Sequence, residues 1–202
     1  MERVTLRSIM SEGLVRSGFS FRERITNNPH GSVSVVQMKD LLDGCSGIAQ
    51  EGIFRVAGED IGSQHLLWKG DVLFVSKGAN NRAVVYDLDL PKAVAASAFF
   101  VLRPDPAKVV PLYLAWWINQ KPVQEYLHQN MAGTYIPNIT KPTVEGITLP
   151  LPPLEQQRQI AALSSLAQAE QRIMNELMIK RQQLIDRLLI SSIKQSTNTI
   201  TE

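Results

Sequence analysis

Two patterns of apolar residues divide the chain. As far as about residue 150, short apolar runs rich in β-branched and aromatic side chains alternate with Gly, Pro, Asn and Asp, which is typical of strands joined by turns. The expected strands are residues 33–36, 52–56, 71–75, 83–86 and 98–102. Their number and spacing predict a curled sheet.

A helix is expected between the last of these strands and residue 130. Pro111 stands where a first-turn proline is tolerated. The apolar residues at helical spacing after it are Leu112, Trp116, Val123 and Leu127. Lys121-Pro122 can divide this helix of residues 111–129 in two, because a proline inside a helix costs ~3 kcal/mol.

After residue 153 the apolar period changes and Gly and Pro disappear. Apolar residues recur at steps of three, four or seven among charged and amide residues, which predicts one long helix over residues 153–190, roughly 57 Å long at ~1.5 Å per residue. The stripe consists of Ile160, Leu163, Leu166, Ala167, Ile173, Leu177, Leu184 and Leu188. Lys180 interrupts it, and a lone helix of this kind needs a partner helix in water. The polar residues 191–202 are expected to fray.

The composition excludes some classes of protein but does not indicate a particular function. The chain has 202 residues, a net charge of +2 and a pI near 8.7, which permits nucleic-acid binding but fits an ordinary slightly basic enzyme equally well. No apolar run approaches the ~18 residues of a membrane span, and the first residues lack a signal-peptide core. Cys45, the single cysteine, excludes an internal disulfide. We therefore expect a cytoplasmic protein that has no contact with membranes.

Candidate catalytic residues are few. His30, His65 and His128 lie far apart and outside any metal-binding spacing, and there is no Gly-rich phosphate loop with a following Lys. Cys45 is conceivable as a nucleophile, but a buried small residue is the favoured interpretation. We expect no catalytic residue, no metal site and no cofactor in this chain.

The first candidate DNA-contacting loop is Ser76-Lys77-Gly78-Ala79-Asn80-Asn81-Arg82, between two expected strands. It contains two cations and two amides without an acid. Lys and Arg neutralise phosphates or pair with guanine, and Asn can bond adenine through two contacts. The same composition describes a solvated hairpin turn. Both interpretations stay open for Lys77, Asn80, Asn81 and Arg82.

Two further segments are candidates. Residues 133–141 place Tyr135 and Asn138 for contacts in a groove and Thr134 and Lys141 for phosphates; the alternative is a connecting loop whose tyrosine packs on the sheet. The third candidate is the pair Arg22 and Arg24. Glu23 lies between them and weakens it, and the alternative is a pair of charges that face solvent.

Residues 144–157 carry the most specific pattern, Val144-Glu145-Gly146-Ile147-Thr148-Leu149-Pro150-Leu151-Pro152-Pro153-Leu154-Glu155-Gln156-Gln157. With residues 133–138 they resemble the end of a target-recognition domain and the start of its spacer helix in the specificity subunits of type I restriction–modification systems. Residues 35–41, 70–78 and 111–114 resemble more degenerate parts of the same unit.

The resemblance implies an α+β fold in three parts. Residues 1–150 would be a curled β-rich target-recognition domain with short helices, residues 151–190 one long coiled-coil spacer and dimerisation helix, and residues 191–202 a polar flexible tail. A full-length specificity subunit carries two such units, so we expect either a truncated gene product or a half-size form. It would act as a homodimer held by Ile160, Leu163, Ile173, Leu177, Leu184 and Leu188.

The resemblance also implies a non-catalytic role in a restriction system. The recognition domain would read one half of a bipartite site in double-stranded DNA. It would dock DNA methyltransferase (modification) subunits and restriction subunits, to which S-adenosylmethionine, Mg and ATP would belong. The alternative function is a protein-interaction module that does not bind DNA and oligomerises through its coiled-coil helix.

Overall fold

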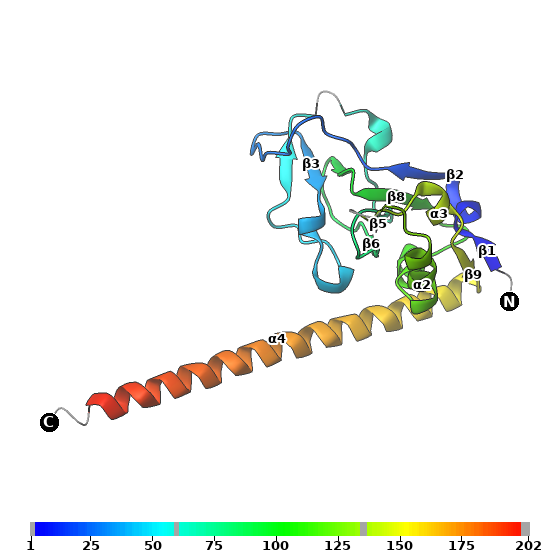
Figure 1. Cartoon of the computed structure of the whole chain (residues 1–202). Helices are drawn as coiled ribbons and strands as arrows, with labels where there is room; N and C mark the ends of the chain where they lie inside the picture. The colour runs from blue at the N-terminus through cyan, green and yellow to red at the C-terminus, as the bar shows by residue number, and fades with distance from the viewer. Residues whose placement is uncertain (1–2, 59–60, 134–136, 199–202) are drawn as a thin grey trace. The chain divides into compact units, whose positions relative to one another are not determined.

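Short strands form three sheets in the N-terminal part of the chain (Figure 1). The computed structural model describes residues 3–58, 61–133 and 137–198, and the chain divides into two units, Met1–Ala161 and Ala162–Glu202. The strands are β1 (Arg3–Thr5), β2 (Met10–Ser17), β3 (Val33–Val36), β4 (Phe54–Val56), β5 (Val72–Val75), β6 (Ala83–Val85), β7 (Ala93–Ala95), β8 (Phe99–Pro104) and β9 (Thr148–Pro150). Each of the five expected strands is confirmed by one of these.

The main sheet has the order β2-β8-β5-β6 and is antiparallel throughout. A second sheet, β4-β3-β7, contains the parallel pair β3–β7, and β1 pairs with β9 in a third. Alternate residues of β5 enter different cores: Val72 and Phe74 pack with the helices, and Leu73 and Val75 pack with Val36 of the second sheet. A strand covered on both faces has no polar side, which is why β5 reads as an unbroken apolar run.

The predicted division of the helix at residues 111–129 is confirmed. α1 (Pro111–Ile118) and α2 (Lys121–Gln129) are separate, and each has a proline in its first turn. Asn119 lies in the corner between them. Its side chain donates to the Ala83 carbonyl and accepts from the Ala83 amide, both at 2.8 Å, so the corner is fastened to strand β6. A third helix, α3 (Lys141–Glu145), precedes β9.

The long helix α4 (Leu154–Asn198) has 45 residues. It continues eight residues past the predicted end of the helix at residue 190. The reason is local: no Gly or Pro follows Pro153, and polar side chains alone do not stop a helix. The α+β class, with a β-rich unit followed by a long C-terminal helix, is confirmed.

The start of α4 belongs to the first unit. Gln157 is fully buried there, and its side chain accepts from Val110 N at 2.9 Å and donates to the carbonyls of Pro152 (2.8 Å) and Lys108 (3.1 Å). Ala161 is also buried in the core that contains α1.

In the described residues, no helix has the length and apolarity required to cross a membrane.

Candidate nucleic-acid interface

The first two candidate loops meet in the structure. Lys77 and Asn138 form a β-bridge, Gly78 N donates to Pro137 O at 2.9 Å, and Ile139 N donates to Ser76 O at 2.8 Å. Gly78 has a φ of 89°, a left-handed conformation that suits glycine at this turn. Segments about 60 positions apart in the sequence therefore form one element, which we name the bridged loops (residues 76–82 and 137–141). Thr134 and Tyr135 lie outside the described residues.

Most of the candidate side chains on the bridged loops face outward. Lys77, Asn80, Arg82 and Asn138 are exposed, and neither Lys77 nor Arg82 forms an ion pair with another described residue. Asn81 is different, and the expectation that its side chain is available to DNA is corrected. It is 2% exposed, and its amide donates to Val75 O at 3.0 Å, so it closes the β5–β6 turn from inside.

The positive charge of Lys141 is partly compensated by a nearby carboxylate. It is the first residue of α3, its side chain is half-exposed, and its Nζ lies 3.9 Å from Glu145 Oε1 one turn later. Thr140 caps the same helix through its hydroxyl, which accepts from Thr143 N. A phosphate at this point would compete with Glu145, so Lys141 offers a weaker contact than Lys77.

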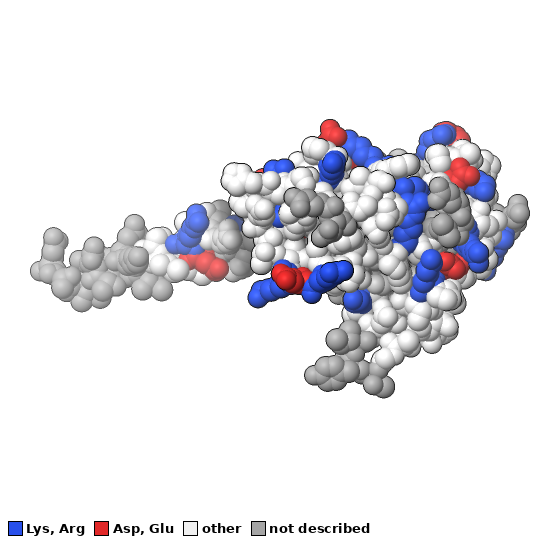
Figure 2. Space-filling model, turned by 90° about the horizontal axis from the view of Figure 1, so that it is seen from above, with Lys and Arg blue, Asp and Glu red and all other residues white. Residues whose placement is uncertain are grey.

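Arg22 and Arg24 are exposed on a segment that we name the arm (residues 19–24). The arm is fastened at its base, where Phe19 N donates to Ala95 O at 2.7 Å and the Phe19 ring packs edge-on against Phe21 with centroids 4.8 Å apart. The segment before β3 lies near the top of Figure 1, and Figure 2 views the molecule from that side. There, Lys and Arg side chains are widely spread, with fewer Asp and Glu among them.

The arm and the bridged loops are bonded to the same stretch of backbone, residues 93–98. The backbone from β7 to the start of β8 pairs with Leu66, with Phe19 and, through the carbonyl of Ala98, with Ser76 N. Ser76 in turn accepts from Ile139. One short stretch of main chain thus carries the base of each candidate segment.

Sequence reasoning missed the 3-10 helix η4 (Ser63–His65). The residue after it, Leu66, pairs with Val94 of the same stretch of backbone. Gln64 is exposed, and Arg16 of β2 donates to its main-chain carbonyl. A run of three polar residues after Gly62 is a faint signal, and η4 is too short to show a hydrophobic period. Only the fold places it beside the arm.

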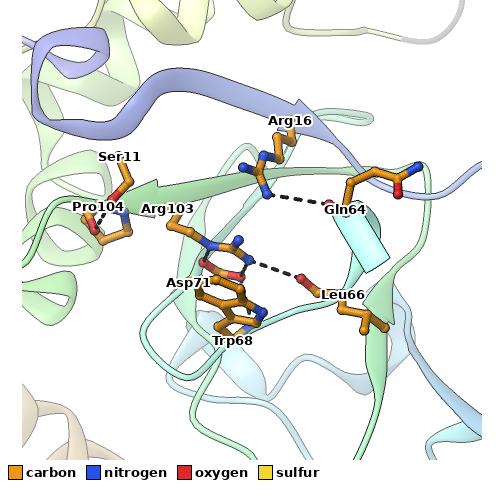
Figure 3. Close-up of polar contacts among 8 residues, drawn as sticks. All are labelled: Ser11, Arg16, Gln64, Leu66, Trp68, Asp71, Arg103 and Pro104. Atoms are coloured by element: carbon orange, nitrogen blue, oxygen red, sulfur yellow. Dashed lines mark hydrogen bonds and ion pairs between the residues drawn. The ribbon is translucent and has the colours of Figure 1, made fainter. Parts of the chain in front are cut away.

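The Gly70-Asp71 pair of the family-like segment has an architectural role. Arg103 clamps the buried Asp71 carboxylate with two bonds of 2.7 Å, and Trp68 N donates to it at 2.9 Å (Figure 3). The Trp68 ring covers the guanidinium of Arg103, 4.0 Å from its centroid. Planar bidentate pairing and stacking are the geometry that arginine provides best.

Nothing in the described part of the chain groups metal-ligating side chains: no cluster of three or more His, Cys, Asp or Glu is present there. His65 packs edge-on against Phe19. Burial raises the pKa of the Cys45 thiol, with Arg82 opposing the shift. A thiol with a raised pKa is a poor nucleophile, which favours the structural interpretation of Cys45.

The expected dimerisation residues do not behave alike. Ile160 packs against the core of the first unit, which corrects its assignment to an open stripe. The remaining residues are exposed by 57% or more: Leu163, Ile173, Leu177, Leu184 and Leu188. Met174, Met178, Ile179, Ile185 and Leu189 are also exposed, so the apolar surface between residues 173 and 190 extends over a wider arc than one stripe.

Comparison with known proteins gives one consistent family. Residues 16–179 match the family model described as "Type I restriction modification DNA specificity domain". A curated relative, the type I restriction enzyme MjaVIII specificity subunit of Methanocaldococcus jannaschii, is 31% identical over 97 residues, covering 48% of this chain and 22% of that protein.

Solved structures share the fold at low sequence identity. The HsdS subunit of Thermoanaerobacter tengcongensis has a TM-score of 0.64 and 21% identity over 87% of this chain and 44% of its own. A type I R-M system structure, described in terms of complex assembly and conformational transition, has a TM-score of 0.65 and 20% identity over 86% of this chain and 44% of its own. The S subunit of M. genitalium has a TM-score of 0.55. The chain spans less than half the length of each of these relatives.

Proposed function

The chain belongs to the type I restriction–modification DNA specificity family, and from that premise we propose that its β-rich unit reads one half of a bipartite site in double-stranded DNA. The observation that carries the proposal is the pairing of the bridged loops. They join two exposed cations and two exposed amides in one element whose backbone is held by hydrogen bonds. A rigid backbone with outward polar side chains is what recognition of base edges requires.

The exposed side chains divide by chemistry. Lys77 and Arg82 would contact phosphates, which sets register and affinity without reading sequence. Asn80 and Asn138 would contact base edges, where an amide can bond adenine through two contacts. Asn81 has no part in this, because it is buried.

The helix α4 would act as the spacer between two reading heads. Its exposed apolar residues need a second long helix, and we propose a second copy of this chain in antiparallel orientation. With 45 residues the helix is about 68 Å long, or about 20 base pairs, which is an upper limit on the separation of the half-sites.

Modification and restriction subunits would complete the assembly. The wide apolar arc between residues 173 and 190 supports packing by more than one neighbouring helix. In this proposal the chain is non-catalytic and works in the cytoplasm. The modification subunit binds S-adenosylmethionine and methylates adenine, and the restriction subunit uses Mg and ATP.

Methylome sequencing tests the proposal. Cells that carry the modification subunit should show one methylated motif when this gene is present and lose it when the gene is deleted. If two identical chains related by a twofold axis do the reading, the motif is an interrupted palindrome. An asymmetric bipartite motif would require a different second specificity chain.

The rival function is an interaction module that does not bind DNA. Duplex binding whose affinity falls steeply with salt argues for the reading function, because released counterions give that dependence. Binding that is absent at low salt, together with an unchanged methylome, would favour the rival.

A further inference from the structure

The 3-10 helix η4 (Ser63–His65) is short, and its backbone is bonded to neighbouring strands. Arg16 of β2 donates to the Gln64 carbonyl at 3.5 Å, and Arg103 of β8 donates to the Leu66 carbonyl at 3.1 Å (Figure 3). Leu67 N, directly after it, donates to Ala93 O at 2.8 Å. Because Arg103 is itself clamped by Asp71, the backbone of η4 is tied to the central sheet.

The side chain of Gln64 is not used by these bonds. Both arginines bind main-chain carbonyls, and the Gln64 amide forms no hydrogen bond within the described residues. In Figure 3 this side chain extends away from Arg16. It lies over Gly62, since a Cβ built on Gly62 would come within 2.3 Å of Gln64 Oε1. The fold therefore presents an exposed carboxamide on a fixed backbone.

The arm lies next to η4. The Phe19 ring is packed edge-on against both Phe21 and His65, with centroids 4.8 Å and 5.2 Å apart, and so joins the two segments. Beyond Phe19, a surface hollow of about 680 Å³ runs along the arm, with Arg22 and Glu23 in its wall. Arg22 and Arg24 are exposed, and neither forms an ion pair with another described residue.

We propose that Gln64 is a specificity-determining residue that reads one adenine in the major groove, and that Arg22 and Arg24 bind phosphates of the same duplex. Adenine presents N7 as an acceptor and N6 as a donor, which a glutamine amide matches with two bonds. The arginines neutralise phosphates whatever the sequence. The inference rests on the proposed function, and it adds a second reading element to the bridged loops.

The experiment exposes the full chain to a pool of duplexes with randomised sequence and sequences the bound fraction. The variants are Gln64→Ala, Gly62→Ala, and Arg22→Ala combined with Arg24→Ala. Gln159→Ala is the matched control, because Gln159 is also an exposed glutamine and lies at the start of α4. Unfolding midpoints should match the wild type, since the Gln64 side chain has no bond to lose and Gly62 has an ordinary φ of −66°.

Wild type and Gln159→Ala should enrich the same motif. Gln64→Ala should lose preference at one A·T pair of each half-site by about ten-fold or more and keep the rest. Gly62→Ala keeps the amide but displaces it, so the same pair should be weakened by less. The double arginine variant should keep the motif, bind all duplexes more weakly, and lower the slope of log affinity against log salt by about 2.

The outcomes separate this inference from the function on which it rests. If the wild type enriches no motif, the proposed function itself fails. If it enriches a motif and Gln64→Ala leaves that motif as Gln159→Ala does, Gln64 reads nothing. A loss of preference at a G·C pair would overturn the assignment to adenine. If the double arginine variant enriches a different motif, the assignment of Arg22 and Arg24 to phosphates alone is wrong.

Discussion

Asp71 illustrates how one buried carboxylate organises several segments. It accepts two bonds from Arg103 on the neighbouring strand β8 and one from Trp68 N, while its own amide donates to Trp68 O at 2.9 Å. Side-chain exposure is 1% for Asp71 and 13% for Arg103. The pair fixes the turn before β5, and through Arg103 it also fixes the end of η4.

Asp71→Asn should therefore lower the free energy of unfolding by about 3 kcal/mol, because it leaves the largely buried Arg103 without its counter-charge. Denaturant titration measures this. Asp89→Asn is the control: Asp89 also pairs with a cation, Lys69 at 3.5 Å, but is 95% exposed, so the change should be near zero. Equal losses in the two variants would contradict the structural weight given to Asp71.

The buried side chain of Gln157 likewise joins several backbone segments, at the start of α4. Gln157→Ala removes three hydrogen bonds and leaves a backbone amide and two carbonyls without their partner, at a cost of about 2–4 kcal/mol. The neighbouring Gln156 is exposed, and Gln156→Ala should change stability by about 0.5 kcal/mol or less. Thermal or denaturant unfolding of both variants distinguishes a buried clamp from simple helix propensity.

Tyr86 gives the chain a dependence on alkaline pH. Burial, and then the charges of Asp71 and Asp89, raises the pKa of Tyr86 to about 12, against an unfolded value near 10. Between these values the unfolded chain has lost the phenolic proton and the folded chain keeps it, so stability falls as pH rises through this range. Tyr86→Phe should remove up to about 2–3 kcal/mol of that loss, measured as unfolding free energy at pH 9 and near pH 12. If the unfolding free energies of the wild type and Tyr86→Phe fall equally between pH 9 and pH 12, Tyr86 is not the cause of the loss.

At the scale of elements, the bridged loops predict unequal contributions from their cations. Lys77→Ala should weaken binding to every duplex and lower the salt slope by about 1. Lys141→Ala should do less, because Glu145 already compensates Lys141. Lys121→Ala, an exposed lysine of α2 paired with Glu125, serves as control and should change neither quantity. Binding isotherms at several salt concentrations measure both, and a larger effect at Lys121 than at Lys77 would exclude this surface.

Sequence predicted elements where one physical signal dominates. Apolar runs predict strands such as β5, ring geometry predicts the proline division between α1 and α2, and periodicity predicts the long helix α4 and its start. Strand β7 was missed because Ala93 and Ala95 have little strand propensity and are held by the parallel pairing with β3. The eight-residue strand β2 was missed as well; a register shift between Met10 and Val15 breaks its alternation.

The candidate site was predictable in composition and not in geometry. The loops at residues 76–82 and 133–141 stand out by their cations, amides and lack of acids. Their pairing through Lys77 and Asn138 is a long-range contact that no local pattern encodes. Asn81 could not be separated from Asn80 for the same reason, since only the packed turn shows which amide points inward.

At the scale of the whole molecule, the exposed residues of α4 predict association. Replacing Leu177 and Leu184 with Glu should give a folded monomer, because charges within the apolar stripe oppose helix pairing. Light scattering and sedimentation measure the change in mass. The control replaces Gln168 and Gln183 with Glu, which adds the same charge away from Leu177 and Leu184, in the case of Gln183 beside Lys180 and Arg187, and should leave association intact. A wild-type chain that is monomeric at tens of micromolar, with α4 stable by itself, would sink the idea.

The way the loops are fastened bears on how such a protein can change its target. Gly78 binds Pro137, Ile139 binds Ser76, and Leu67 binds Ala93, in each case from amide to carbonyl. Main-chain bonds of this kind are available to almost any residue, so the exposed side chains can be exchanged without loosening the support. Randomising Asn80, Asn138 and Gln64 together should yield folded variants at high frequency. Under the proposed function, such a library would contain folded variants that prefer different DNA sequences while their loop supports stay the same.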